Sequence, residues 1–418
     1  MNILMMTNTY IPHVGGVARS VVTFTDELRN LGHRVIVVAP EYDQEIEDEK
    51  DTIRIPAIQH FNGSDFSMVL PIPAYLDAHL QNFKPNVVHS HHPFLIGSTA
   101  ARISAKYNVP LVYTQHTMYE QYTHYVPMEF HRMKKFVVSL STGYANMSEH
   151  VIAPSDSIAK VLIQRGVKVP MDIIPTGVYI EKFENGDGKA FRISNNIPEN
   201  VFVVGHLGRL APEKNLEFLS KAIASFLQKE PDAHFLVIGY GSSKEQMNEF
   251  FTEQKLNKRV HFFGKLQGQD LIDAYHAMDV FAFSSKSETQ GLVLVEAMSA
   301  GVPVVALDAP GVREVVNDRI DGYLLMEENY ESFSMALSKM YYLSKDARQK
   351  FIIEAQKRAR DFSAQKCALK LASVYERLPG KKRMGDSNDK SLWHKSIEQI
   401  KIEWELLSNI TAAIEDAI

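Results

Sequence analysis

The sequence has almost no cysteine and no long hydrophobic segment. Cys367 is its single cysteine in 418 residues, so no disulfide can form within the chain, as is typical of a reducing compartment. No apolar run approaches the roughly 20 residues that a membrane-spanning helix needs. The start, Met1–Met6, carries no charged side chain and leads into an Asn-Thr turn, which predicts a buried strand and not a signal peptide. We therefore expect a cytoplasmic protein.

A strong net charge and a dinucleotide motif are also missing. Lys and Arg number 45 against 50 Asp and Glu, a formal net charge of −5, so nucleic acid is not an expected partner. The glycine fingerprint G-x-G-x-x-G does not follow the first apolar run, which argues against an oxidoreductase. A chain of 418 residues exceeds one ordinary core, and two or three domains are expected.

Short apolar runs alternate with amphipathic stretches, which is the pattern of a parallel α/β protein. We predict two doubly wound, Rossmann-like domains, residues 1–180 and 190–360, that face a central cleft, with a linker at Glu184–Gly188. The strands expected in the first domain are Ile3–Thr7, Arg34–Ala39, Val87–His89, Leu111–Thr114, Val151–Ala153 and Asp172–Ile174. Those expected in the second domain are Val201–Leu207, His234–Gly239, Val260–Phe263, Val280–Ala282 and Pro303–Ala306.

The most specific motif is a pair of glutamates, Glu288 and Glu296, on either side of Gly291. Glu288 falls in a turn between strand and helix, and Glu296 falls inside the helix expected over Leu292–Ala300. Glycine lets a backbone approach a ligand closely, and a helix N-terminus offers N–H groups to a phosphate. Two carboxylates beside such a site suit hydroxyl groups. The alternative is an ordinary surface helix whose acidic residues favour its dipole.

The second motif is Gly208-Arg209 followed by Lys214, at the end of an expected strand. Two cations in a tight loop can neutralise a diphosphate leaving group. A solvated loop with an Arg and a Lys is the alternative.

Two further segments follow strands of the first domain. The paired glycines Gly15 and Gly16 open a helix expected over Val17–Leu31, whose amide end could bind a phosphate. The stretch Tyr113–Tyr125 is rich in aromatic and polar side chains that can pack on a sugar and hydrogen-bond to it. Its candidate ligand-binding residues are His116, Tyr119, Tyr122 and His124.

Three histidines, His89, His91 and His92, raise the alternative of a metal site. No Asp, Glu or Cys in the same segment completes the ligand set, so we expect no metal.

In combination these motifs resemble glycosyltransferase family 4, the retaining enzymes of the GT-B fold, over residues 1–378. The resemblance implies that residues 1–180 bind the acceptor, that residues 190–360 bind a nucleotide sugar, and that residues 361–380 form a helix crossing back to the first domain. Retention at the anomeric carbon is implied as well, with no metal because protein cations replace it.

The resemblance also assigns roles to the motif residues. Arg209 and Lys214 would hold the donor diphosphate, and Glu296 would bind ribose hydroxyls. The donor sugar would be contacted by His116, Glu288, Gln290, Gly291 and Leu292. Residues framing the phosphates, the nucleobase or the acceptor would be Gly15, Gly16, Gly264, Lys265, Leu266 and His13. The catalytic set is then His116, Arg209, Lys214 and Glu288.

The acceptor and the final helix are less constrained. Tyr113–Tyr125 is similar to bacterial enzymes that glucosylate diacylglycerol, which favours UDP-glucose as donor and a position on the inner membrane face. Residues 1–180, however, carry 14 Lys and Arg against 16 Asp and Glu, a net charge of −2, so a soluble acceptor stays open. A sugar-nucleotide epimerase or a non-catalytic nucleotide-sugar-binding protein would also account for these motifs.

Residues 386–418 form an additional segment with helical spacing. Its apolar stripe consists of Trp393, Ile397, Ile400, Trp404, Leu407 and Ile414. We expect this stripe to be buried, either against the protein's own body or against a second copy in a homodimer. Membrane contact is less favoured because the segment is acidic towards its end.

Overall fold

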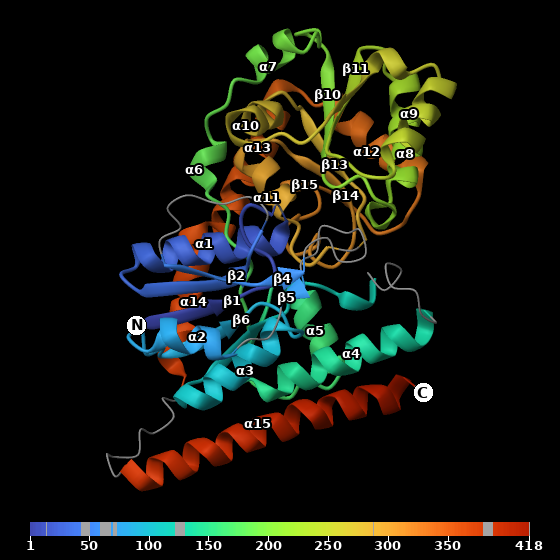
Figure 1. The fold of residues 1–418 in the computed structure, drawn as a ribbon. Coiled ribbons are helices and arrows are strands. Elements are labelled where there is room, and N and C mark those ends of the chain that lie inside the picture. Colours follow the sequence, from blue (N-terminus) through green and yellow to red (C-terminus); the bar gives the residue numbers. More distant parts are fainter. Residues whose placement is uncertain are drawn as a thin grey trace. The chain divides into compact units, whose positions relative to one another are not determined.

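The computed structural model describes residues 1–13, 15–42, 51–58, 68–69, 73–121, 130–286, 288–378 and 388–417. The chain divides into two compact units, which Figure 1 shows in ribbon form. The first unit comprises Met1–Gly177 and Ala364–Ile418, and the second comprises Val178–Ser363. The segment Glu184–Gly188, expected to be a linker, belongs to the second unit. Its glycines Gly186 and Gly188 lie directly against His276, which leaves no room for a Cβ atom.

The first unit contains a sheet of seven parallel strands. In spatial order these are β3 (Thr52–Ile55), β2 (Arg34–Pro40), β1 (Asn2–Met6), β6 (Val87–Ser90), β7 (Leu111–Thr114), β8 (His150–Ala153) and β9 (Met171–Ile173). The order reverses between β1 and β6, which is the place where doubly wound sheets bind ligands. A separate antiparallel pair joins β4 (Ala57–Ile58) to β5 (Met68–Val69).

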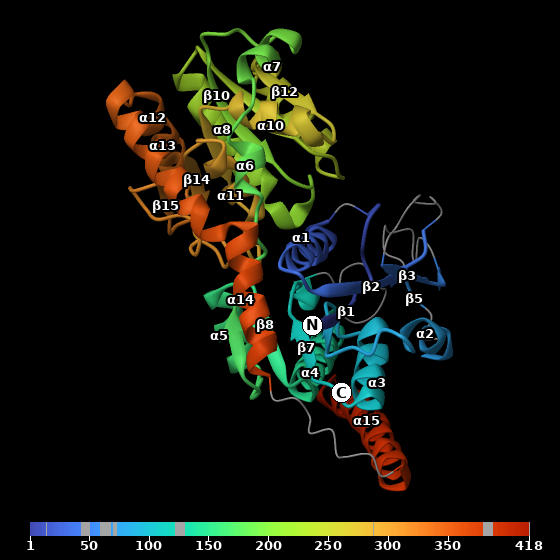
Figure 2. The ribbon, with the colours of Figure 1, turned by 90° about the vertical axis from the view of Figure 1, so that its left-hand side faces the viewer.

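Helices cover both faces of this sheet because every central strand buries both of its faces. Ile3 and Met5 of β1 pack on the side of α1 (Gly16–Asn30) and α14 (Ala364–Arg377), where Cys367 is fully buried. Leu4 and Met6 pack on the opposite side. The helices there are α2 (Pro73–Leu80), α3 (Ile96–Tyr107), α4 (Phe130–Met147) and α5 (Asp156–Gln164). Figure 2 shows α3 across the sheet from α1.

The second unit repeats this architecture with six parallel strands. Their order is β12 (Val260–Phe263), β11 (Ala233–Ile238), β10 (Phe202–Leu207), β13 (Val280–Phe283), β14 (Val304–Leu307) and β15 (Gly322–Leu325), so the reversal lies between β10 and β13. One face carries α8 (Leu216–Lys229), α9 (Lys244–Glu253) and α12 (Tyr330–Tyr341). The other carries α6 (Ile180–Phe183), α7 (Gly188–Ser194), α10 (Gly268–His276), α11 (Leu292–Ser299) and α13 (Lys345–Ala359).

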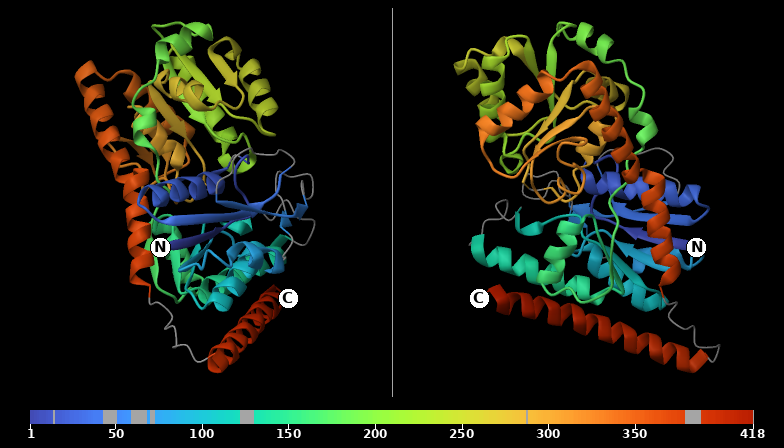
Figure 3. Two further views of the ribbon diagram at one scale, coloured as in Figure 1. Left: turned by 60° about the vertical axis from the view of Figure 1, so that its left-hand side comes forward. Right: turned by 180° about the vertical axis from the view of Figure 1, so that it is seen from behind.

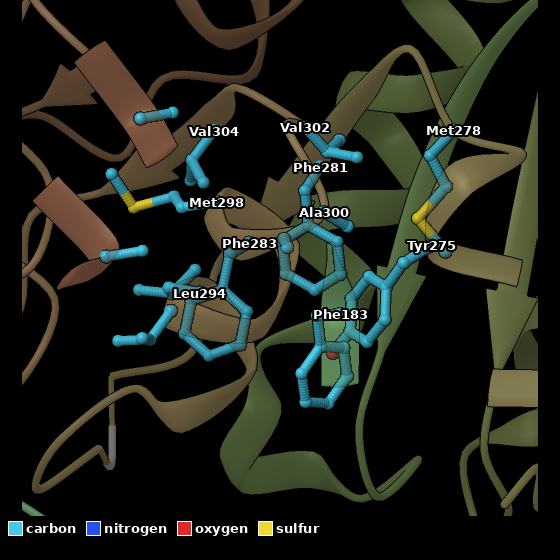
Figure 4. Packing of buried hydrophobic residues seen from close by; sticks show 14 of the residues in the cluster. Phe183, Tyr275, Met278, Phe281, Phe283, Leu294, Met298, Ala300, Val302 and Val304 are labelled. Carbon is cyan, nitrogen blue, oxygen red and sulfur yellow. The ribbon is translucent and has the colours of Figure 1, made fainter. Parts of the chain in front are cut away.

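An aromatic cluster holds α11 in place on this second face. The Tyr275 ring lies 5.7 Å from that of Phe183 and 6.0 Å from that of Phe281, measured between ring centroids. Figure 4 shows these rings together with that of Phe283, which lies next to Leu294 of α11 in this view. Such buried aromatic pairs contribute about 0.5–1.5 kcal/mol each beyond their area. The helix that carries Glu296 is therefore anchored on a rigid core.

The C-terminal segment forms one long helix, α15 (Asn388–Ala417), which lies along α3 and α4 (Figure 3). Its buried face carries Ile402, Leu406, Asn409 and Ala413. Asn409 donates to the carbonyl oxygen of Leu140 at 3.0 Å, over Gly143, where a Cβ would clash with the Asn409 side chain. Arg102 of α3 pairs with Glu403 at 2.5 and 2.9 Å.

Of the two ways in which the apolar stripe was expected to be buried, docking against the protein's own body does not occur among its described residues. Ile400 and Trp404 are each 71% exposed and Leu407 is 60% exposed, so that stripe points away from the body. The docked residues, Ile402, Leu406, Asn409 and Ala413, lie on the opposite side of the helix, against α3 and α4. No described helix is long and apolar enough to cross a membrane.

Candidate active site

The two charged motifs of the second unit meet where its strand order reverses. The loop with Arg209 and Lys214 follows β10, and the loop with Glu288 follows the neighbouring strand β13. Lys214 Nζ donates to Glu288 Oε1, and the two side chains are only 15% and 18% exposed. The sequence separation of these two residues gave no sign of this contact. The structure therefore joins the proposed diphosphate-binding and sugar-binding residues into one ion pair.

Arg209 is the more accessible cation of the loop. Its guanidinium pairs with Glu213 at 2.6 Å and is 45% exposed. Lys214 lies in a short 3-10 turn, Pro212–Lys214, directly before α8. The loop thus presents one solvent-facing cation and one partly buried cation.

Gly291 is the N-cap residue of α11, and its backbone is in the left-handed conformation, with φ +65° and ψ +45°. A Cβ atom there would lie 2.9 Å from Leu294 Cδ1 and 3.0 Å from the carbonyl oxygen of Gly311. Gly311, also at positive φ, lies against the backbone of Gln290, where its own Cβ would come within 2.6 Å of the nitrogen. The turn at Gly291 is therefore packed against the loop that contains Gly311. The first N–H groups of α11, from Leu292 onward, lie at the N-terminus of this helix.

Glu296 lies inside α11, as expected, but it is buried. Its Oε2 accepts a hydrogen bond from the Tyr275 hydroxyl at 2.8 Å, and the residue is 2% exposed. Tyr275 was not a candidate in the sequence, because a tyrosine at helical spacing looks like core. Gly264 and Leu266 follow β12, and a Cβ at Gly264 would meet nothing within 4 Å, so that position is open.

His206, near the end of β10, is a further site residue that the sequence motifs did not indicate. Its Nδ1 donates to the carbonyl oxygen of Ala282 at 3.1 Å, and its buried Nε2 has no partner among the described residues. Burial is the main cause that lowers the pKa of His206 to about 4, with the nearby Lys214 acting in the same direction. A neutral imidazole therefore lies beneath the Lys214 loop.

In the first unit the glycine loop is positioned as expected. Helix α1 begins at Gly16, with Gly15 as its N-cap residue in extended conformation. A Cβ at Gly16 would meet nothing within 4 Å, and one at Gly15 would lie 3.0 Å from His13 Nε2. His13 and the N-terminus of α1 therefore lie together at the carboxyl end of β1. Val14 is outside the described residues.

His116 follows β7 and belongs to a buried group of histidines. Its Nε2 lies 2.9 Å from His91 Nδ1. His89 contacts the His91 ring at 4.2 Å between centroids, and its two nitrogens bond Tyr375 Oη at 2.6 Å and Thr114 Oγ1 at 2.7 Å. Burial lowers the pKa of His89 and of His116 to about 3, so both rings are neutral at physiological pH.

The remaining acceptor candidates are only partly described. The Tyr119 ring contacts Phe94 at 4.9 Å and is partly exposed, while Tyr122 and His124 lie outside the described residues. His92 Nδ1 accepts from the Asn8 backbone N–H at 3.1 Å. Within the described ranges no group of three or more His, Cys, Asp or Glu side chains is arranged to hold a metal ion. The three histidines are instead hydrogen-bonded to neighbouring protein groups.

Two family models match the chain along most of its length. "Glycosyltransferase Family 4" matches residues 14–182, and "Glycosyl transferases group 1" matches residues 187–358. The alpha-monoglucosyldiacylglycerol synthase of Acholeplasma laidlawii is 30% identical over 318 residues, which cover 73% of this chain and 80% of that protein. The chain belongs to glycosyltransferase family 4. This confirms the resemblance drawn from the motifs.

A second relative of this glycosyltransferase carries the same name, and a third carries a different one. The alpha-monoglucosyldiacylglycerol synthase of Streptococcus pneumoniae is 29% identical and covers 79% of this chain and 76% of its own length. The sulfoquinovosyl transferase of Arabidopsis thaliana is 31% identical over 74% of this chain and 60% of that protein.

Solved structures confirm the GT-B fold. An Anabaena protein, HepE, in complex with UDP has a TM-score of 0.74 at 22% identity and covers 90% of this chain and 100% of its own. The sucrose-phosphate synthase of Thermosynechococcus elongatus has a TM-score of 0.74 at 19% identity, and it covers 90% of this chain and 99% of its own. At these identities the likeness concerns the fold alone.

Proposed function

We propose that this glycosyltransferase moves a hexose, with glucose from UDP-glucose as the first candidate, onto a hydroxyl of a glycerolipid such as diacylglycerol. The observation that carries the proposal is the Lys214–Glu288 pair at the strand reversal of the second unit, beside the N-terminus of α11. The names of two relatives, both alpha-monoglucosyldiacylglycerol synthases, support the glycerolipid acceptor. A soluble acceptor is the alternative. The enzyme would work in the cytoplasm, peripherally on the inner membrane face.

The site suits a donor that carries both a diphosphate and hydroxyl groups. When the diphosphate binds, Lys214 can exchange its carboxylate partner for phosphate oxygens, and Glu288 is then released to accept a hydroxyl of the sugar. The backbone at Gln290, Gly291 and Leu292 contacts the same sugar. Glu296 would turn from the Tyr275 hydroxyl to the ribose, and Gly264 and Leu266 would frame the base.

In the proposed reaction the bond between the anomeric carbon and the diphosphate oxygen breaks, and a bond to the acceptor oxygen forms on the same face. The acceptor proton passes to the departing diphosphate, so no separate base is needed. Arg209, Lys214 and the N–H groups of α11 stabilise the charge that develops on that leaving group. For the first unit, the family resemblance assigns sugar and phosphate binding to His116, Gly15 and Gly16, and acceptor binding to His13, Tyr119, Tyr122 and His124.

A panel experiment tests this function. The purified protein is incubated with UDP-glucose, UDP-galactose and GDP-mannose, each with diacylglycerol vesicles or soluble sugars, and products are analysed by mass spectrometry. A new α-glycoside of diacylglycerol is expected. A glycoside of a soluble sugar would show that the acceptor is a soluble sugar and not a lipid. Conversion of the donor without any acceptor would identify an epimerase. Donor binding with no product under any condition would identify a non-catalytic protein.

Transfer should persist after treatment with a chelator, because Arg209 and Lys214 supply the positive charge that a bridging ion would otherwise provide. The initial rate is measured with and without excess EDTA, and then after adding Mg²⁺ or Mn²⁺. An unchanged rate is expected. Loss of activity that either ion restores would contradict this prediction and would make His91 and His92 candidate metal ligands.

We also propose that two copies pair through the outward stripe of α15. The stripe carries six large apolar side chains with exposed fractions between 41% and 71%: Ile397, Ile400, Trp404, Leu407, Ile410 and Ile414. If each of these side chains buries about 100 Å², two such stripes together bury on the order of 1,200 Å², which is the lower limit of stable protein interfaces. An antiparallel arrangement brings the N-terminal part of one helix near the acidic residues Glu415 and Asp416 of the second copy and opposes the helix dipoles.

Leu407→Glu should separate the pair, whereas Ala412→Glu, an equal charge at an exposed position off the stripe, should not. Light scattering is expected to give dimers for the wild type and Ala412→Glu, and monomers for Leu407→Glu. Both tryptophans of the protein lie in α15, so tryptophan emission should shift to shorter wavelength as the wild type associates. A monomeric wild type that binds vesicles through the same stripe would instead assign this face to a membrane.

A further inference from the structure

We infer that His91 is a positioning residue that fixes His116 in the tautomer with its proton on Nδ1, so that His116 offers an N–H donor to the bound ligand. The inference rests on the proposed function only in making a sugar oxygen the acceptor of that N–H. The tautomer itself follows from the hydrogen bonds inside the first unit.

The contact between the two rings allows only two arrangements. His91 Nδ1 and His116 Nε2 are 2.9 Å apart, and a hydrogen bond between two neutral imidazoles requires a proton on one of these nitrogens and a lone pair on the other. Either His91 donates from Nδ1, or His116 donates from Nε2. The second ring nitrogen of each residue has the opposite protonation state to the first.

The second nitrogen of His91 decides between them. His91 Nε2 is buried and has no hydrogen-bond partner within the described part of the chain. If His116 were the donor, His91 would carry its proton on this atom, and a buried N–H would be left without an acceptor, which is rare in folded proteins. If His91 donates from Nδ1, the buried atom is a bare lone pair. The neighbouring ring of His89 does not compete for His91 Nδ1, because its own nitrogens are bonded to Tyr375 and Thr114.

The same choice determines what His116 can do. Its Nε2 accepts from His91, so its proton is on Nδ1, the nitrogen for which we find no partner among the residues described. Burial keeps the ring neutral, since the pKa of His116 is lowered to about 3. His116 therefore acts as a neutral hydrogen-bond donor to a ligand oxygen, such as a hydroxyl of the transferred sugar, and not as a general acid or base.

The tautomer can be read directly. Protein labelled with ¹⁵N-histidine is examined by NMR at pH 7.5 without ligand, and the His116 signals are identified as those absent from His116→Asn. Chemical shifts of a neutral ring protonated on Nδ1 are expected. A ring protonated on Nε2, or an even mixture of tautomers, would overturn the inference whether or not the protein has transferase activity.

Kinetics test the consequence for the ligand. His91→Asn can keep an amide N–H near the position of Nδ1, while His91→Leu removes the donor. We expect His91→Leu to reduce kcat/KM for the donor about 10–100-fold, mainly through KM, and His91→Asn to restore most of it. Tyr375→Phe is the matched control, because it removes a hydroxyl from His89 in the same buried group without touching the His91–His116 contact.

The outcomes separate the two proposals. If His91→Leu and the wild type transfer equally well, the positioning role is wrong and the transferase function stands. If the wild type transfers to no acceptor in the panel, the proposed function fails, and the NMR measurement still decides the tautomer. If His91→Leu does not fold, His91→Asn and the NMR measurement carry the test.

Discussion

Lys214→Ala and Glu288→Ala are each expected to lower kcat/KM about 10²–10⁴-fold, because each removes a group that we propose contacts the reacting part of the donor. The structure adds that these two side chains form a partly buried ion pair. Removing one of them leaves the other charge without its partner, which also costs stability. The rates are measured with the donor and acceptor that the panel identifies, and the free energy of unfolding is measured by urea titration.

The double variant Lys214→Ala/Glu288→Ala separates these two effects. Because it leaves no unpaired charge, it should recover part of the stability lost in the single variants, yet its activity should stay at the lowest level. The control is the exposed pair Lys221–Glu217 on α8, with a distance of 2.6 Å, whose alanine variants should alter neither quantity appreciably. Near-normal turnover in both single variants would show that the donor site lies elsewhere.

Acidification below neutral pH should destabilise the first unit strongly. His89, His92 and His116 are buried there, and burial lowers the pKa of each from 6.5 to about 3. The unfolded chain therefore binds more protons than the folded chain between these two pH values, and stability falls as pH falls through that window. Each histidine contributes about 1.4 kcal/mol per pH unit below 6.5.

Hydrogen exchange at pH 7.5 and 5.5, corrected for the intrinsic exchange rates, measures this loss strand by strand. Amides of β6 and β7 should lose more protection free energy than those of β11, because the second unit holds fewer such histidines: burial lowers the pKa of His206 and of His234 there to about 4. His92→Asn can retain an acceptor for the Asn8 backbone N–H while removing one titrating group. Over the first pH unit below 6.5, the free energy of unfolding of this variant should therefore fall by about 1.4 kcal/mol less than that of the wild type. An identical loss in the variant and the wild type would show that His92 is not held neutral in the folded protein.

Local sequence patterns determined the architecture of each unit. The run Leu111–Thr114 is a strand with the expected bounds and is buried on both faces, as is typical of a central parallel strand. Val260–Phe263 is also a strand with the expected bounds, although it lies at the edge of its sheet and is only partly buried. The glycine at position 291 marked the start of α11, because few other residues adopt its positive φ without strain. The charged residues near it, combined with the Arg209–Lys214 loop, were enough to indicate the family.

The tertiary structure decided how these residues are paired and which faces are buried. Lys214 and Glu288 are 74 residues apart, and only the parallel pairing of β10 with β13 brings their loops together. His91 and His116 meet because β6 and β7 are neighbours in the other sheet. On α15 the periodicity correctly indicated a helix, but it did not show which face packs against the protein's own body. A helix with apolar residues on two opposite sides gives the same period for both. The packing against α3 and α4, where Gly143 lies opposite Asn409, selected the side that carries Ile402, Leu406 and Ala413.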